Sequence, residues 1–506
     1  MNNLITQFDN EDIDYIDQSK DYLHNDTHKS NGWTIIMKYV LISKNNPFVI
    51  KKIQHSDLFD LNKKNNNGWS PLLLACENFN IIDNNIVNIL IKKGVDINTK
   101  NNNGINCLML ASKNSNLVLV KILIDNGINI NDKDINGKSA LLWASRYSCV
   151  NIVNELIKNG ININDREING CSALNIISRY SRNNNKKNIL NLLLSNNIDV
   201  NICHNNGWNS LMIASKYSNT DSDIETIQLL IDNDIDINNQ DSQGYTALMI
   251  AVFNSNNTSN LDTVQLLINN GADLNIQNNY GSTALMLAAR NTNTSSNLET
   301  VQLLINNGAN LNIKNIYGMN ALMLSVIGVN IGSSLDTIKF LITSGANIND
   351  QDNNGWTALM LASGYVNSLS NKKTIHLLLD NGALINIKND DDCSAFDILL
   401  FNNNIDDDLI ELYINFGAII SHFHDNISDY LKIKYYIKHF KKINLIDDDL
   451  LLSCILLKNK YIDDILSAKH HLFFKPNNLG MFHSHSNFFN NVSFPLHNKF
   501  KFIFDL

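Results

Sequence analysis

A glycine that recurs at near-constant intervals constrains the fold of this chain more than any other feature. Each copy is followed by a short run of small and apolar residues. The copies stand at Gly32, Gly68, Gly104, Gly137, Gly170, Gly207, Gly244, Gly281, Gly318 and Gly355, with Asp392 in the same place of an eleventh copy. The intervals are 36, 36, 33 and 33 residues, and then 37 residues six times. This register predicts an array of repeated units, each burying its apolar surface against its neighbours.

The unit that begins at Gly281 shows what one repeat is expected to form. Residues 283–289 (TALMLAA) predict a short helix whose small side chains allow close packing against a neighbour. Residues 301–305 (VQLLI) carry apolar side chains at helical spacing and predict a second helix. Gly308 then suits a left-handed helix cap. The following residues lead, as an extended turn that we call the finger, to Gly318.

A second glycine position supports this division of the unit. The cap after the second helix recurs at Gly94, Gly127, Gly160, Gly271, Gly308, Gly345, Gly382 and Gly417. Where glycine is missing, Asn197 and Asp234 stand in its place. Asn and Asp tolerate the left-handed conformation best after glycine, so the substitution agrees with the assignment.

One of the 33-residue units resembles the repeat of a known protein family. Residues 137–164 (GKSALLWASRYSCVNIVNELIKNGININ) resemble an ankyrin repeat, and the resemblance extends over roughly residues 30 to 420. It implies an all-α repeat solenoid of stacked helix-turn-helix units with projecting, hairpin-like fingers. It also implies a protein partner bound on a concave surface made of fingers and first helices.

The composition carries a further resemblance. Many slightly long repeats in an Asn-, Ile- and Lys-rich chain resemble the ankyrin-repeat proteins of giant DNA viruses of amoebae, the mimivirus type. This implies a viral protein that engages host proteins. A protist with an AT-rich genome would share the composition and stays open as the source.

Two features depart from the family pattern. The usual Thr-Pro-Leu-His opening of the first helix is mostly Thr-Ala-Leu-Met, as at residues 246–249, and Pro71 alone keeps the proline. Since proline pre-sets φ, we expect each repeat to be less stable than an ideal unit.

The 37-residue units hold four extra residues between their helices. We expect tolerated polar loops there, at the edge opposite the fingers and locally mobile, with a second ligand-facing edge as the alternative.

Charge and composition exclude several classes of protein. The net charge is −9, from 40 basic and 49 acidic residues, and only five residues are Arg. A nucleic-acid binder would need a basic stripe, so this class is not expected. No stretch reaches the roughly 18 apolar residues of a membrane span. The seven Cys are scattered and form no C-x-x-C pair, which favours free thiols in the cytoplasm.

Large aromatic residues gather at one position of the repeat, directly after the turn glycine. This aromatic slot holds Trp33, Trp69, Trp208, Tyr245 and Trp356. Trp and Tyr offer rigid contact area at low entropic cost, so we interpret the slot as part of a partner-binding surface. The alternative is that each ring packs on its own finger and the next one.

A second set ends the first helix in three consecutive repeats. This basic–aromatic ladder consists of Arg146, Tyr147, Arg179, Tyr180, Lys216 and Tyr217. Stacked repeats would place equivalent positions about 10 Å apart, in a row that suits an acidic, aromatic-containing protein segment. The alternative is that each Tyr caps its helix while the cation is solvated.

The register divides the chain into an N-terminal cap segment (1–30), about eleven ankyrin-like repeats (31–420) and a C-terminal region (421–506). The C-terminal region holds 8 of the 13 His. Residues 447–466 predict a helical cap, followed by a Phe- and His-rich tail that either packs back on the array or docks a partner. The paired histidines of this tail lack the spacing of a zinc site.

We expect the chain to be a non-catalytic, monomeric interaction scaffold for a protein partner. It has no phosphate loop, no G-x-S-x-G and no H-E-x-x-H motif, so we assign no catalytic residue, metal or cofactor. The alternative function is a substrate adaptor that recruits host ubiquitin-ligase machinery through its C-terminal region.

Overall fold

The computed structural model describes residues 32–419 apart from 45, 81, 83–84, 148, 181–183, 330–332, 367–371 and 402–406. Contacts between α carbons divide the chain into two compact units, and all described residues lie in the unit Lys29–Ile427. These residues are helical, and their only β-pairing consists of three isolated bridges within fingers.

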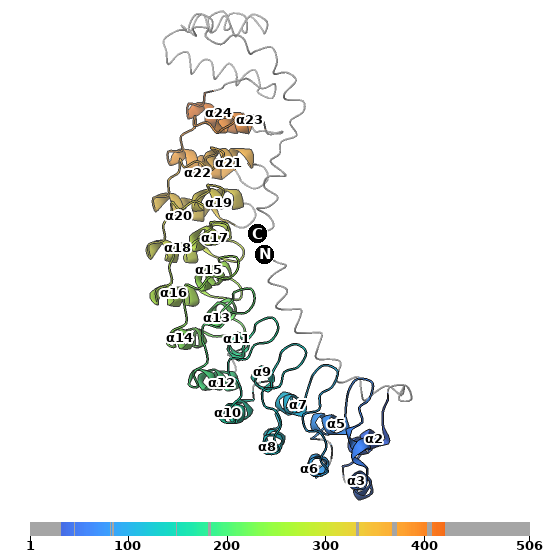
Figure 1. Ribbon diagram of the computed structural model, residues 1–506. Helices are drawn as coiled ribbons and strands as arrows, with labels where there is room; N and C mark the ends of the chain where they lie inside the picture. Colours follow the sequence, from blue (N-terminus) through green and yellow to red (C-terminus); the bar gives the residue numbers. More distant parts are fainter. Residues whose placement is uncertain are drawn as a thin grey trace, which may run out of the picture. The chain divides into compact units, whose positions relative to one another are not determined.

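Eleven pairs of helices follow one another along the described residues (Figure 1). The first helices are α2 (Ile35–Leu41), α5 (Pro71–Glu77), α7 (Cys107–Lys113), α9 (Ala140–Arg146), α11 (Ala173–Arg179), α13 (Ser210–Tyr217), α15 (Ala247–Phe253), α17 (Ala284–Arg290), α19 (Ala321–Gly328), α21 (Ala358–Gly364) and α23 (Ala395–Leu400). The second helices are α3 (Pro47–Gln54), α6 (Asn85–Lys92), α8 (Leu117–Asp125), α10 (Val150–Lys158), α12 (Asn184–Leu194), α14 (Ile224–Ile231), α16 (Leu261–Asn269), α18 (Leu298–Asn306), α20 (Leu335–Thr343), α22 (Lys372–Asp380) and α24 (Asp407–Asn415). A short extra helix, α4 (Leu58–Asn62), follows α3. The predicted all-α repeat solenoid is confirmed.

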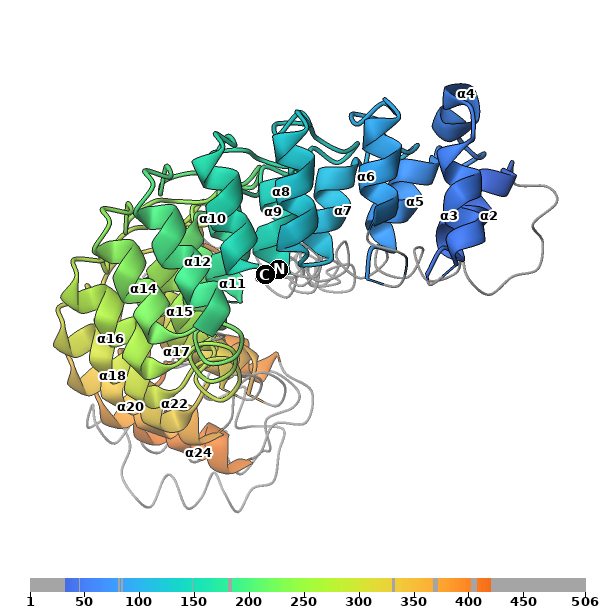
Figure 2. The ribbon, with the colours of Figure 1, turned by 90° about the horizontal axis from the view of Figure 1, so that it is seen from below.

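The helices stack in two rows, which Figure 2 shows side by side. Each first helix packs on the first helix of the next repeat, as α17 does on α19, and most second helices pack on the next second helix, as α16 does on α18. The first helices are buried almost all round, whereas a second helix buries one stripe, such as Val264 and Leu267 of α16. The apolar core therefore lies between the two rows.

Most first helices have a polar N-cap residue whose side chain accepts a hydrogen bond from the helix backbone. Thr246 accepts a hydrogen bond from the backbone N–H of Met249 at 3.2 Å, and Asn320 accepts one from Met323 at 3.0 Å. This cap satisfies one of the free donors at a helix start. It supplies local order where the repeats lack the family's proline.

The two glycine positions of the repeat meet different physical demands. Both adopt positive φ, 71° at the turn Gly281 and 91° at the cap Gly308. A Cβ on Gly281 would come within 2.6 Å of the backbone N of Ile316 in the next finger, whereas a Cβ on Gly308 would meet nothing within 4 Å. The cap therefore needs only the left-handed conformation, which Asn197 and Asp234 also adopt, at φ 57° and 63°.

Most fingers are closed by a polar side chain three residues before the turn glycine. In the finger that ends at Gly281, the Oδ1 atom of Asn278 accepts hydrogen bonds from the backbone N–H groups of Tyr280 and Ser282, at 3.0 and 2.9 Å. The tip of this finger also donates a backbone hydrogen bond, from Asn279 to the carbonyl of Gln243 in the preceding finger, at 2.9 Å. The fingers are thus built like Asx turns and linked to one another.

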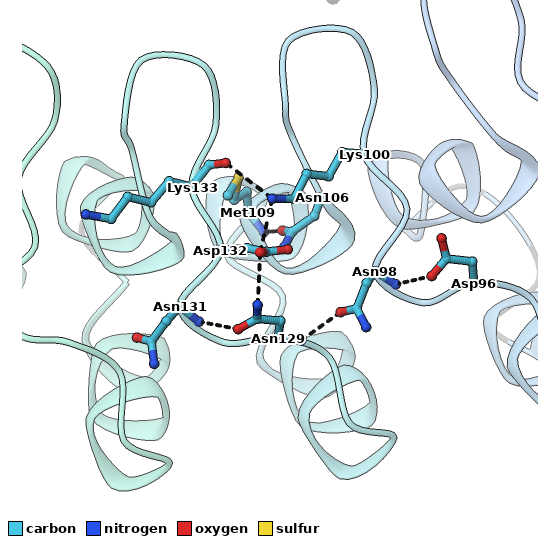
Figure 3. A network of polar contacts seen from close by, with 9 residues as sticks. All are labelled: Asp96, Asn98, Lys100, Asn106, Met109, Asn129, Asn131, Asp132 and Lys133. Carbon is cyan, nitrogen blue, oxygen red and sulfur yellow. Dashed lines mark hydrogen bonds and ion pairs between the residues drawn. The ribbon is translucent and has the colours of Figure 1, made fainter.

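A continuous row of side-chain hydrogen bonds, which we call the asparagine ladder, runs along the base of the fingers. One asparagine per repeat accepts a hydrogen bond from a backbone N–H of the next repeat, as Asn98 does from Asn129 at 2.8 Å (Figure 3). The accepting residues are Asn62, Asn98, Asn131, Asn164, Asn201, Asn238, Asn275, Asn312, Asn349 and Asn386. These asparagines therefore join successive repeats from one end of the described array to the other.

Some extra residues of the 37-residue units behave differently from what the sequence suggested. Ser218 Oγ accepts a hydrogen bond from Thr263 Oγ1 of the next repeat, at 2.7 Å. Equivalent bonds join Ser255 to Thr300, at 2.9 Å, and Thr292 to Thr337, at 3.0 Å. These buried hydroxyls form what we call the hydroxyl seam. In the described part of the insertions, these small hydroxyl side chains pack between adjacent repeats, whereas Asn256, Asn257, Asn293 and Thr294 are exposed as polar loop residues. The mobility of these loops stays a prediction.

Candidate partner-binding face

The aromatic slot is not uniform in its exposure. Trp69 and Tyr245 are only 9% and 5% exposed, whereas Trp33, Trp208 and Trp356 are half-buried. Trp69 and Tyr245 are therefore mainly packing residues, as the alternative interpretation of the slot proposed. The three half-buried tryptophans keep part of their surface accessible.

Slot tryptophans reach along their own first helix to its far end. The ring of Trp356 packs near Gly364, the last residue of α21, where an added Cβ would lie 3.4 Å from it. The equivalent ring of Trp208 lies 5.8 Å from the ammonium of Lys216 in α13. Trp208 also donates a hydrogen bond from its Nε1 atom to Asp241 Oδ2 in the next finger, at 2.9 Å. Trp208 of the aromatic slot therefore contacts Lys216 of the basic–aromatic ladder. In the sequence these two sets of residues are separate.

The ladder residues of α11 and α13 stack on one another. The guanidinium of Arg179 lies 5.1 Å from the ring centroid of Tyr180 and 4.8 Å from that of Tyr217. The ammonium of Lys216 lies 4.7 Å from the ring of Tyr217. Lys216 and Tyr217 are only 6% and 7% exposed, so the expectation of a solvated cation is wrong for Lys216. Cation–π attraction to two rings offsets part of the cost of its burial.

The first pair of the ladder, Arg146 and Tyr147, packs differently from the other two pairs. Tyr147 does not stack on Arg146 but on Trp143 of the same helix, with ring centroids 6.0 Å apart and the planes 3° from parallel. Lys138, at the slot position of this repeat, lies 6.0 Å from the Trp143 ring. Lys138 thus occupies the slot position and lies over Trp143 of the first helix, so a cation and an aromatic ring also meet in this repeat.

Lys186, at the start of α12, joins this group although the sequence interpretation did not include it. Its ammonium lies 4.2 Å from the ring of Tyr180. Burial lowers the pKa of Lys186, the nearby charge of Arg146 lowers it further, and Asp221 opposes the effect. We call Arg146, Arg179, Lys186 and Lys216, with the rings of Tyr180, Tyr217 and Trp208, the cation–aromatic cluster. In the sequence, the adjacent lysines Lys186 and Lys187, a few residues after Tyr180, could have indicated that Lys186 belongs to this group.

Two exposed apolar residues lie at neighbouring fingertips and were also missed. Ile135 is 52% exposed and Ile168 is 66% exposed. They stand two residues before a turn glycine, where most other fingers hold a polar residue such as Asn102 and where Ile316, also 52% exposed, is a third isoleucine. The signal was present in the sequence as an apolar residue at a polar position of the repeat.

Acidic residues near these fingers are paired with lysines. Lys133 Nζ lies 2.9 Å from Asp165 Oδ1, and Lys138 Nζ lies 3.3 Å from Glu167 Oε2. Such pairs fix the fingers and neutralise their carboxylates. The basic side chains of this region can hold anionic groups by electrostatic attraction.

Other expectations concern thiols, metals and the chain ends. The six cysteines among the described residues are free thiols, and burial raises the pKa of Cys149. Within the described residues no group of three His, Cys, Asp or Glu side chains could hold a metal ion. The N-terminal cap segment, the helical cap of residues 447–466 and the Phe- and His-rich tail lie outside the described residues. In the part of the chain that is described, no helix is both long and apolar enough to cross a membrane.

Comparison with known proteins agrees with the architecture. A family model described as ankyrin repeats (3 copies) matches residues 10–101, 79–167, 177–278, 255–352 and 295–389. No curated protein matches the chain. The matches of the family model cover well over half of the sequence, and their spacing agrees with the helix pairs and fingers described above. The chain belongs to the ankyrin-repeat family.

Proposed function

We propose that this protein is a non-catalytic scaffold that binds a protein partner through the face formed by its first helices and fingers. Ankyrin repeats generally mediate protein–protein interaction. The observation that carries the proposal for this chain is the cation–aromatic cluster, in which Arg179 lies between Tyr180 and Tyr217 from adjacent repeats. Side chains already ordered in this way lose little entropy when a partner binds.

Proximity labelling tests the proposal. The full chain is fused to a biotin ligase and expressed in amoebal cells, and the labelled proteins are compared with those of a variant carrying Arg146→Ser, Tyr147→Ala and Tyr180→Ala. These three side chains are half-buried, so we expect a folded variant that loses one defined group of labelled proteins. An unchanged set of labelled proteins would contradict the proposed binding face.

A matched control removes charge from the other row of helices. Lys158 of α10 and Lys339 of α20 are exposed on second helices. Changing both to Ser should leave the labelled set unaltered. Thermal unfolding followed by circular dichroism establishes that each variant keeps its helices.

The biological setting is proposed from the sequence resemblance. The resemblance to ankyrin-repeat proteins of giant DNA viruses of amoebae supports a role in engaging host proteins. The adaptor alternative rests on residues 421–506, which lie outside the described residues. Labelling with a chain that ends at residue 420 separates the two, because a ligase adaptor would lose ligase components while keeping its substrates.

A further inference from the structure

Charge is unevenly distributed along the array. Residues 98–220 hold 13 basic and 7 acidic residues, whereas residues 221–400 hold 6 basic and 18 acidic residues. Four of the five arginines fall between Arg146 and Arg182. A chain of net charge −9 thus carries a local positive excess, followed directly by a negative stretch.

The positive excess coincides with the cation–aromatic cluster. Arg146 ends α9, Arg179 ends α11 and Lys216 lies in the last turn of α13, so the same position is cationic in three consecutive repeats. Lys186 lies close enough to Arg146 for the arginine to lower its pKa. Like charges held this close raise the local positive potential and attract an anion.

We infer that the cluster binds an acidic protein segment, rich in Asp or Glu, that runs across α9, α11 and α13. This inference rests on the proposed scaffold function and names the chemistry of its partner. Stacked repeats are about 10 Å apart and an extended chain advances about 3.3 Å per residue, so three repeats match roughly seven residues. The negative stretch of residues 221–400 repels such a segment and sets the limit of its site.

Single-stranded nucleic acid is the competing anion, and the geometry favours protein. Nucleic acid without base pairing gains much of its binding energy by stacking bases on exposed aromatic rings. Here the rings of Tyr180, Tyr217 and Trp208 face the chain's own cations, at 4.2 to 5.8 Å. The rings therefore order the cations, whose combined positive charge attracts carboxylates.

Fluorescence anisotropy with the full chain tests the inference. The probe is a labelled peptide of about ten residues, mostly Glu with two Phe, and the reference peptide has Gln in place of every Glu. We expect the Glu peptide to bind at about 50 mM salt and to weaken roughly tenfold at about 300 mM, because salt screens charge pairs. Equal binding of the Gln peptide would overturn the inference. So would a single-stranded RNA of equal length that binds as tightly as the Glu peptide.

Substitution locates the site. The double variant Arg146→Gln/Arg179→Gln should weaken binding of the Glu peptide roughly five- to tenfold, and Lys158→Gln/Lys339→Gln should not change it. Because Arg179 packs between two rings, its loss can unfold the repeat, and Lys186→Gln then serves as the second variant. If Lys186→Gln and the Lys158/Lys339 control bind alike, the site is not the cluster. Failure of peptide binding with intact partner labelling would overturn the acidic ligand and leave the scaffold function standing.

Discussion

Asn238 joins two repeats by itself: its Oδ1 atom accepts a hydrogen bond from the backbone N–H of Asp273, at 2.8 Å, and its Nδ2 group donates to the carbonyl of Gly271, at 3.3 Å. Removing the side chain leaves a donor and an acceptor of the next repeat without their partner. We expect Asn238→Ala to lower the free energy of unfolding by about 1 to 3 kcal/mol, measured by urea denaturation. Asn269→Ala, at an exposed site on α16, is the control and should have little effect.

Ser255 gives a test of the hydroxyl seam. Its Oγ atom lies 2.9 Å from Thr300 Oγ1 and 3.2 Å from Ser296 Oγ, and all three side chains are buried. We expect Ser255→Ala to reduce stability by about 1 to 2 kcal/mol, because the buried hydroxyl of Ser296 loses its partner and Thr300 keeps only its bond to Asn297. The double variant Ser255→Ala/Thr300→Val should be less destabilised than the sum of its single variants. Additive losses would show that the two hydroxyls do not interact.

Asp352 gives a pH dependence of defined sign. Burial raises the pKa of its carboxyl above the ordinary value, although hydrogen bonds from the backbone N–H groups of Trp356 and Asn354 oppose the shift. Its Oδ2 atom is buried with no hydrogen bond. Since the folded pKa exceeds the unfolded one, the wild-type protein loses stability as pH rises from the unfolded pKa, about 4, through the folded pKa.

The variant Asp352→Asn should therefore be more stable than the wild type at pH 7, on the order of 1 kcal/mol, and equal to it below about pH 3. Asn389 and Asn315 hold the equivalent position of other fingers and accept the same two backbone hydrogen bonds, so the substitution fits the turn. The measurement is chemical denaturation across this pH range. A stability difference that does not vary with pH would contradict the assignment.

The exposed fingertips offer a test that is independent of charge. Ile135→Asn/Ile168→Asn restores the residue found at Asn102 and Asn205 of other fingers. Stability should change by less than about 0.5 kcal/mol, since exposed side chains bury little on folding. If the partner contacts the fingers, its capture by the immobilised full chain should fall, by roughly two- to tenfold. Undiminished capture would limit the binding face to the first helices.

The repeat frame could be predicted from the sequence because most of its demands are local. A cap needs a left-handed residue, and Gly, Asn or Asp meets that need within one unit, as Gly308 and Asn197 show. The alternation of two helices and a finger follows from the same short-range patterns. The turn glycine is the exception, because the backbone of the next finger leaves no room for a Cβ on Gly281.

Interactions between repeats could not be predicted in this way. The partner of Asn238 lies 35 residues ahead, and that of Ser255 lies 45 ahead, so neither pairing is visible within one unit. The burial of Lys216 depends on Trp208 lying over it, which requires the direction in which a slot ring points. The sequence predicted the ladder as one row, but in the structure Arg179 and Lys216 pack on tyrosine rings, whereas Tyr147 stacks on Trp143.

The asparagine ladder has a consequence for how such a gene can change in length. Each asparagine bonds to a backbone N–H, and the donors include Asp273, Leu384 and Ile419, so the bond is indifferent to the side chain of the next unit. Units of 33 and 37 residues both supply this donor. A whole unit can therefore be duplicated or deleted by recombination while every remaining junction still closes, so the number of repeats can evolve separately from the residues that recognise a partner.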